Sequence, residues 1–185
     1  VLPGRYVSTW YDPTEPGRMI NGNDGGANIS VDGGETWSTI QNQPTGQFYH
    51  VAVDDQFPFR LYGSQQDAGT VSIASAGDDG GVGPADWQDV AGGESGYVVP
   101  DPTDPNIVYG GGYDAELTRY DVRTGMTRQV TPWARNIMGW APKDLKYRFQ
   151  WTFPIMVSRF APHALYAGGN VLFRSTDQGQ SWSVV

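Results

Sequence analysis

Short apolar runs alternate with polar turns along the whole chain. The runs are rich in Val, Ile, Tyr and Phe, and the turns between them contain Pro, Gly, Asp and Asn. Runs of this length and composition predict β-strands, because a helix needs a longer stretch with a period near 3.6. Four of the runs have few polar positions, which predicts innermost strands buried on both faces. These runs are residues 6–10, 49–53, 97–99 and 153–157.

Four segments then repeat the same order of elements. An apolar run leads into a turn with Pro, a second strand, a Gly-rich turn and a third strand. Pro16, Pro58, Pro105 and Pro162 hold the same place, at intervals of 42, 47 and 57 residues. This is the spacing of four-stranded propeller blades. The repeats predict an all-β β-propeller segment over residues 1–185, with antiparallel blades at about 5–40, 47–90, 95–130 and 151–185 and an aromatic insertion at 131–150.

Composition supports this prediction and removes several function classes. Of 185 residues, 25 are Gly, 13 are Pro and only 17 % are charged, which disfavours a helix bundle or a coiled coil. The absence of Cys excludes disulfides, thiolate zinc sites and cysteine nucleophiles, and it leaves the compartment open. A net charge of −8 disfavours nucleic acid and anionic membranes as partners. With two His and no ligand-like spacing, we expect no metal and no cofactor.

Two octapeptides match closely, residues 30–37 (SVDGGETW) and 175–182 (STDQGQSW). An Asp at the start of a turn accepts hydrogen bonds from the following N–H groups, Gly supplies a positive φ, and Trp folds back as an apolar plug. A degenerate copy occupies residues 121–128. We interpret the motif residues as structural rather than catalytic. They are Ser30, Asp32, Gly34 and Trp37, and Ser175, Asp177, Gly179 and Trp182.

The octapeptides resemble the Asp-box of BNR-repeat propellers, a group with sialidases, xyloglucan-active glycosidases and sortilin-type receptor domains. Other stretches, such as residues 21–26 and 146–151, look like bacterial repeat proteins labelled glycosyl hydrolase or sortilin-like. The resemblance implies a propeller whose ligand site lies on the face opposite the octapeptides, and an extracellular or periplasmic location. It also indicates a piece of a longer protein.

Equivalent turns predict a site on one rim of the propeller. Alignment of the repeats on Ile20, Tyr62, Tyr109 and Tyr166 places Asp24, Asp67, Asp114 and Asn170 in corresponding turns. Asp67 and Asp114 are the catalytic candidates. His50 lies in an apolar run and is interpreted as a core residue. The ligand-binding candidates are Asp24, Tyr49, Gln66, Glu94, Tyr97, Arg148, Trp151 and Asn170.

Three interpretations of this set of rim residues remain open. Its carboxylates, amides and aromatic rings suit a polysaccharide or a peptide, so a binding module is favoured. Paired carboxylates would suit a glycoside hydrolase, but the arginines are scattered where a sialidase would cluster three, and the catalytic Asp motifs of xyloglucan-active relatives do not map onto Asp67 or Asp114. Asp and Asn also favour tight turns for purely local reasons. On this interpretation the aligned residues only stabilise their own turns and bind no ligand.

The insertion at residues 131–150 and the number of blades both indicate which partners the chain has. Residues 131–150 are aromatic and comparatively basic, and we expect this loop to cover the channel mouth, to contact another chain or to pack on itself. Four blades rarely close a ring alone, since the end blades would expose apolar faces and strand edges. We therefore expect self-association or further blades that complete the ring.

Overall fold

The computed structural model describes residues 8–23, 26–40, 46–78, 80–134 and 139–185. Within these ranges the chain is all-β, with antiparallel strands in four sheets and no α-helix. Short 3-10 helices occupy Pro84–Asp86, Tyr113–Ala115 and Pro142–Asp144. No helix in the described ranges has the length and apolarity needed to cross a membrane. The predicted fold class is thus confirmed at the level of antiparallel sheets.

The chain divides into two compact units, 1–45 and 46–185. The first contains one sheet of β1 (Ser8–Tyr11), β2 (Met19–Asn23) and β3 (Gly26–Ser30). Trp10 pairs with Ile20 and Ile20 with Ile29, which aligns three exposed apolar side chains on one face. That all 185 residues form one domain stays a prediction.

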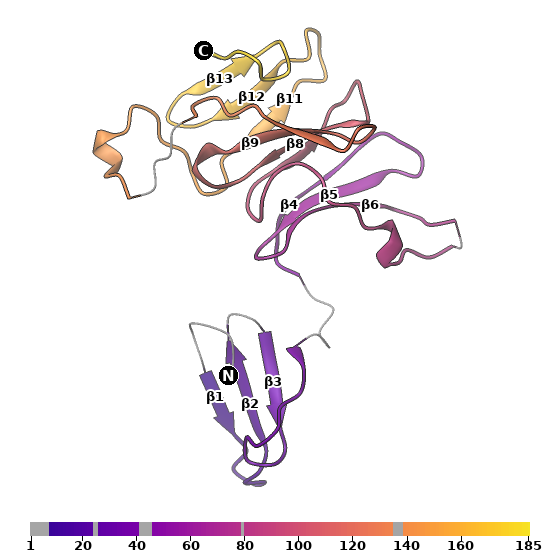
Figure 1. Cartoon of the computed structure of the whole chain (residues 1–185), viewed down its shortest axis with the longest axis vertical. Helices are drawn as coiled ribbons and strands as arrows, with labels where there is room; N and C mark the ends of the chain where they lie inside the picture. Colours follow the sequence, from indigo (N-terminus) through magenta and orange to yellow (C-terminus); the bar gives the residue numbers. More distant parts are fainter. Residues whose placement is uncertain (1–7, 24–25, 41–45, 79, 135–138) are drawn as a thin grey trace. The chain divides into compact units, whose positions relative to one another are not determined.

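The second unit contains three sheets that follow one another along the chain (Figure 1). The first of them has β4 (Phe48–Val53), β5 (Arg60–Gln65) and β6 (Gly69–Ala74). The next has β7 (Val98–Pro100), β8 (Ile107–Gly111), β9 (Leu117–Asp121) and β10 (Met126–Gln129). The last has β11 (Ile155–Val157), β12 (Leu165–Gly168), β13 (Leu172–Ser175) and β14 (Ser183–Val184).

The prediction of four strands in every sheet was wrong for two of them, as far as the described residues show. In the first unit, the Ser38 N–H donates to the Ile29 carbonyl at 2.9 Å, but the Ile29 N–H donates to the Ser38 hydroxyl instead of a backbone carbonyl. The side chain thus ends the ladder. In the second unit, a fourth strand beside β6 is reduced to an isolated bridge between Ser72 and Gln88, because the connection turns through Pro84–Asp86.

Two apolar clusters hold the second unit together. Tyr62, on β5, packs with Val98 and Val108 between the first two sheets of this unit. A larger cluster joins the last two sheets, and its buried members include Ile107, Tyr109, Leu117, Phe153, Ile155, Leu165 and Phe173. β7 lies beside both β4 and β11, so the first strands of the three sheets are neighbours.

The link into β7 approaches β8 closely at Gly110. A Cβ atom at this position would lie 2.0 Å from the carbonyl oxygen of Ala91, a distance that no side chain tolerates. Gly110 is therefore required for this link to lie against β8.

Candidate functional site

The first strands of the three sheets are neighbours, and contacts between residues at or before their starts gather these residues at one end of the second unit. The ring of His50, in β4, stacks on the ring of Tyr97, which precedes β7, with centroids 3.8 Å apart. Trp151 precedes β11, and its indole N–H donates to the Tyr49 hydroxyl at 3.3 Å. His50, expected in the core, is half-buried beside this end.

The turn between β5 and β6 continues the network. The Tyr49 hydroxyl donates to Gln66 Oε1, and Gln66 Nε2 donates to Asp67 Oδ1 at 2.7 Å. The Asp67 N–H donates to Glu94 Oε2 at 2.8 Å. Asp67 has a φ of 60°, a left-handed conformation that Asp adopts more readily than most residues. We call Tyr49, Gln66, Asp67, Glu94 and Trp151 the rim cluster.

Trp151 is the aromatic centre of the rim cluster. Its ring centroid lies 4.2 Å from that of Tyr113, in the turn between β8 and β9. The Trp151 side chain is nevertheless 50 % exposed. Tyr113 was missed by sequence reasoning, although it directly precedes Asp114 in the aligned turns. An exposed indole thus touches residues of two other sheets.

The remaining rim candidates lie elsewhere or have local roles. Asp114 lines a cleft with Trp133 and Trp182. Asn170 Oδ1 accepts from the Arg148 N–H at 2.8 Å, and Asn170 Nδ2 donates to the Lys146 carbonyl at 3.4 Å. Asn170 therefore anchors the link into the last sheet, and it lines a pocket of about 350 Å³ with Arg148. Asp24 lies outside the described residues.

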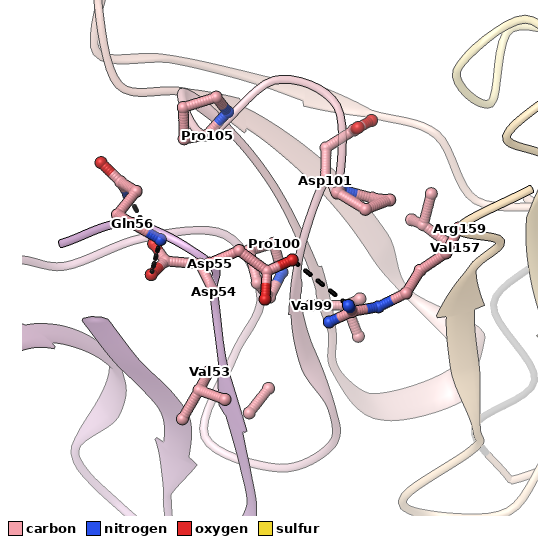
Figure 2. Close-up of a pocket in the computed structure, with 12 residues that line it drawn as sticks. Val53, Asp54, Asp55, Gln56, Val99, Pro100, Asp101, Pro105, Val157 and Arg159 are labelled. Atoms are coloured by element: carbon pink, nitrogen blue, oxygen red, sulfur yellow. Dashed lines mark hydrogen bonds and ion pairs between the residues drawn. The ribbon is translucent and has the colours of Figure 1, made fainter. Parts of the chain in front are cut away.

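A different pocket lies where the same three strands end. It has a volume of about 320 Å³ and is walled by Val53, Val99 and Val157 (Figure 2). Asp55 and Arg159 form an ion pair of 3.2 Å at this pocket, and both side chains are more than half exposed. Such pairs contribute little to stability.

The two buried or half-buried carboxylates of this pocket serve their own turns. Asp101 Oδ1 accepts from the N–H and hydroxyl of Thr103. Asp54 accepts from the Arg60 N–H and the Tyr62 hydroxyl, both at 2.8 Å. Partial burial acts to raise the pKa of Asp54, but these hydrogen bonds outweigh it and hold the pKa below its usual value. Asp54 and Asp101 are thus occupied by hydrogen bonds within their own turns.

The Asp carboxylates of the two octapeptides are also occupied by hydrogen bonds within their own turns. Asp32 accepts from the hydroxyl of Thr36 and from its N–H at 2.9 Å, and Asp177 accepts from the hydroxyl of Ser181 at 2.6 Å and its N–H at 2.9 Å. These bonds, led by those from the side-chain hydroxyls, lower the pKa of each Asp to about 2.

The rim cluster differs from these turn carboxylates because its side chains are at least partly exposed and come from several sheets. Glu94 is half-buried and Asp67 is exposed, and both offer carboxylate oxygens beside an exposed indole. Gln66 adds an amide. This arrangement supplies an apolar ring face with acceptors and donors at its edge, which suits a ligand with both apolar and hydroxyl groups.

Comparison with known proteins assigns no family. No family model and no curated protein matches the chain. Similar solved structures include an ancestral GH74 enzyme (14 % identity, TM-score 0.48), the GH74 enzyme of Niastella koreensis (17 %, 0.46) and the extracellular domain of a hybrid two-component system of B. thetaiotaomicron (17 %, 0.47). They are matched over 98 %, 98 % and 100 % of this chain but only 24 %, 29 % and 25 % of their own length. The chain thus spans about a quarter of each, and at these values the likeness assigns neither family nor activity.

Proposed function

We propose that this chain is a carbohydrate-binding segment of a β-propeller and that the rim cluster is its binding surface. The observation that carries the proposal is the position of Trp151. Its half-exposed indole contacts Tyr49 and Tyr113, while the Gln66–Asp67–Glu94 network lies next to Tyr49. An indole held by two neighbours offers a pyranose ring a fixed apolar face.

The chemistry of the rim cluster favours a neutral glycan. Asp67 and Glu94 accept hydrogen bonds from sugar hydroxyls, and the amide of Gln66 both donates and accepts. The net charge of −8 disfavours anionic ligands. One common mode of peptide recognition is backbone pairing at an exposed strand edge, whereas the rim cluster consists of side chains, and all of them except Tyr49 of β4 come from turns and links. Peptide binding is therefore an outcome of the test rather than the proposal.

The ring that would present this rim is part of the proposal. The neighbouring first strands β4, β7 and β11 support a propeller, because such strands line its axis. The octapeptides, whose Asp residues cap their own turns, support Asp-box hairpins. The face of the β4–β6 sheet with Val51, Leu61 and Trp87 forms an apolar pocket, which supports a ring completed by further blades or a second copy. We place such a protein outside the cytoplasm, where polysaccharides are met.

The proposal is tested by titrating the protein with soluble xyloglucan, xylan and mannan in a calorimeter. Trp151→Ala removes the aromatic face, and we expect affinity to fall by about 30-fold, the effect of losing a contact worth about 2 kcal/mol. Trp10→Ala is the matched control, because both indoles are 50 % exposed. Equal loss in the two variants, or binding of a peptide panel in place of every glycan, contradicts the proposal.

Hydrolysis is the second candidate, favoured by the contact between Asp67 and Glu94. The Asp67 N–H donates to the Glu94 carboxylate, so two residues that bear carboxylates are neighbours, and glycosidases use a pair of carboxylates. Release of reducing ends from the bound polysaccharide, lost in both Asp67→Asn and Glu94→Gln, would support it. Binding without release of reducing ends identifies a non-catalytic module.

A further inference from the structure

A cleft between the sheets β7–β10 and β11–β14 combines tryptophan side chains with carboxylates and amides. Its volume is about 540 Å³, within the range of about 300–1,000 Å³ usual for ligand sites. Its walls come from the β8–β9 turn, the end of β10 with the residues after it, and the octapeptide 175–182. The resemblance implied a ligand site on the face opposite the octapeptides, so this cleft is distinct from that expected site. The side chains that argue for a ligand are Asp114, Glu116, Gln129, Trp133, Gln180 and Trp182.

The two indoles of the cleft are held by contacts beyond it. The Trp133 ring meets the Tyr147 ring edge to face, with centroids 4.9 Å apart, and Lys146 Nζ lies 5.5 Å from the Trp133 ring. The Trp182 N–H donates to the Val130 carbonyl at 3.0 Å, and its ring packs on the larger apolar cluster. Rings that are already fixed lose little conformational freedom when a ligand binds.

The polar side chains of the cleft, which form its polar wall, are hydrogen-bonded in part: Glu116 and Gln129 have partners, and the Asp114 carboxylate has none among the described residues. Gln129 Nε2 donates to Glu116 Oε1 at 2.8 Å, and Gln129 Oε1 accepts from the Thr131 hydroxyl at 3.1 Å. Glu116 is thereby oriented while remaining exposed. In the described part of the chain, no hydrogen bond engages the Asp114 carboxylate. The cleft therefore presents acceptors that a donor group of a ligand satisfies.

Charge narrows the class of ligand. The carboxylates of Asp114 and Glu116 disfavour an anionic group. The Lys146 ammonium already lies over the Trp133 ring, so a cationic ligand would meet a like charge there. A neutral ligand with ring faces for the indoles and hydroxyls for the polar wall remains, and a sugar has both.

The cleft adjoins the rim cluster through one short element. Tyr113 contacts Trp151, and the next residue, Asp114, lines the cleft. Both belong to the 3-10 helix Tyr113–Ala115. We propose that the cleft is a second subsite for a neutral oligosaccharide, and that one glycan chain extends from the rim cluster across this helix into the cleft. The inference rests on the proposed function, since the rim holds the first part of the chain.

The test is calorimetric titration with length series of cello-, xylo- and manno-oligosaccharides. We expect affinity to rise about tenfold or more once the chain reaches from the rim into the cleft, because the second contact is then intramolecular. Trp133→Ala and Glu116→Gln abolish the rise and leave the binding of short oligosaccharides unchanged. Trp10→Ala, the control, keeps both.

The outcomes separate the two proposals. Affinity that is independent of length, or a rise retained in both cleft variants, overturns the second subsite while the rim site stands. Failure of every series to bind overturns both. If Trp133→Ala loses its near-ultraviolet circular dichroism, Glu116→Gln decides, because this exposed side chain is replaced without loss of volume.

Discussion

The two octapeptides have the same internal structure but different surroundings. In each, the Ser hydroxyl donates to the Asp carboxylate, at 2.8 Å for Ser30 and 2.7 Å for Ser175, and accepts from the N–H of the Gly at 2.9 Å and 2.8 Å. The indole partners differ. The Trp37 N–H donates to the Gly34 carbonyl of its own hairpin at 3.1 Å, whereas the Trp182 N–H donates at 3.0 Å to the carbonyl of Val130, the residue that follows β10 of the neighbouring sheet.

This difference separates what a motif determines from what its neighbours determine. Ser, Asp and Gly close the turn through bonds that span at most four residues. The role of the Trp depends on which sheet lies beside it, and in the second octapeptide the Trp joins two sheets across 52 residues of sequence. The first octapeptide is thus a self-contained turn, and the second is also a junction.

The largest expected difference is between Trp182→Ala and Trp37→Ala. Trp182→Ala removes an aromatic side chain from the larger cluster and the bond to Val130, and we expect the second unit to lose about 3 kcal/mol of unfolding free energy. Trp37→Ala removes a bond within its hairpin, with a loss of about 1 kcal/mol confined to residues 26–38. Hydrogen exchange followed by mass spectrometry measures both.

The location of the change is the sharper part of this measurement. Trp182→Ala should accelerate exchange in β9 and at Val130, whose N–H donates to Leu117. Acceleration restricted to residues 175–184 would mean that Trp182 does not join the sheets, and the comparison between the two octapeptides would then fail.

A smaller difference is expected between Gly179→Ala and Gly34→Ala. Both glycines have a positive φ, 81° and 94°, so each substitution costs about 1–2 kcal/mol for the left-handed backbone. A Cβ at Gly179 would also lie 2.6 Å from the stiff Val130 Cβ, whereas at Gly34 the nearest atom is the flexible end of Met19 at 3.0 Å. We expect Gly179→Ala to cost about 1–3 kcal/mol more.

Urea unfolding of the two variants measures this difference, with Gly33→Ala as the control for backbone strain. Gly33 has a φ of 76°, and a Cβ at this position would meet no atom within 4 Å, so its substitution reports the strain alone. Equal losses for Gly179→Ala and Gly33→Ala would show that Val130 yields without cost.

The sequence predicted the features that short segments determine. Short apolar runs between Pro- and Gly-containing turns indicated antiparallel strands, and the strands containing Tyr62 and Tyr109 lie where the repeats placed them. The reduction of the fourth strand beside β6 to the single bridge between Ser72 and Gln88 was missed, although Pro84, in the 3-10 turn before Gln88, was a local signal against a longer strand.

The candidate site was predictable only in part. Tyr49, Gln66, Asp67, Glu94 and Trp151 were all expected on one rim, and hydrogen bonds join them. The contact of Tyr113 with Trp151 and the separate place of Asp114 depend on how two sheets meet. Asn170 lies at the position that the alignment of the turns predicted. Its side-chain amide, however, is hydrogen-bonded to the backbone of Lys146 and Arg148.

We expect no difference between the pKa values of Asp32 and Asp177, and therefore none in how each octapeptide loses stability in acid. The pKa of each is lowered to about 2 from an ordinary 3.8 by the hydroxyl of Thr36 or Ser181, then by the N–H of the same residue, so the causes lie inside the octapeptides. Because the folded pKa is below the unfolded one, the stabilisation is fully present above about pH 4 and is lost as the pH falls through about 2.

Carboxyl chemical shifts in an NMR titration measure both pKa values, and Asp32→Asn and Asp177→Asn assign the signals. Coincident titrations near pH 2 would confirm that the turn is independent of its Trp contacts. A pKa of Asp177 that returns toward 3.8 in Trp182→Ala, while the pKa of Asp32 is unmoved by Trp37→Ala, would show that the junction with Val130 also holds the carboxylate in place. The two octapeptides would then differ in the turn itself, and not only in the partner of the indole.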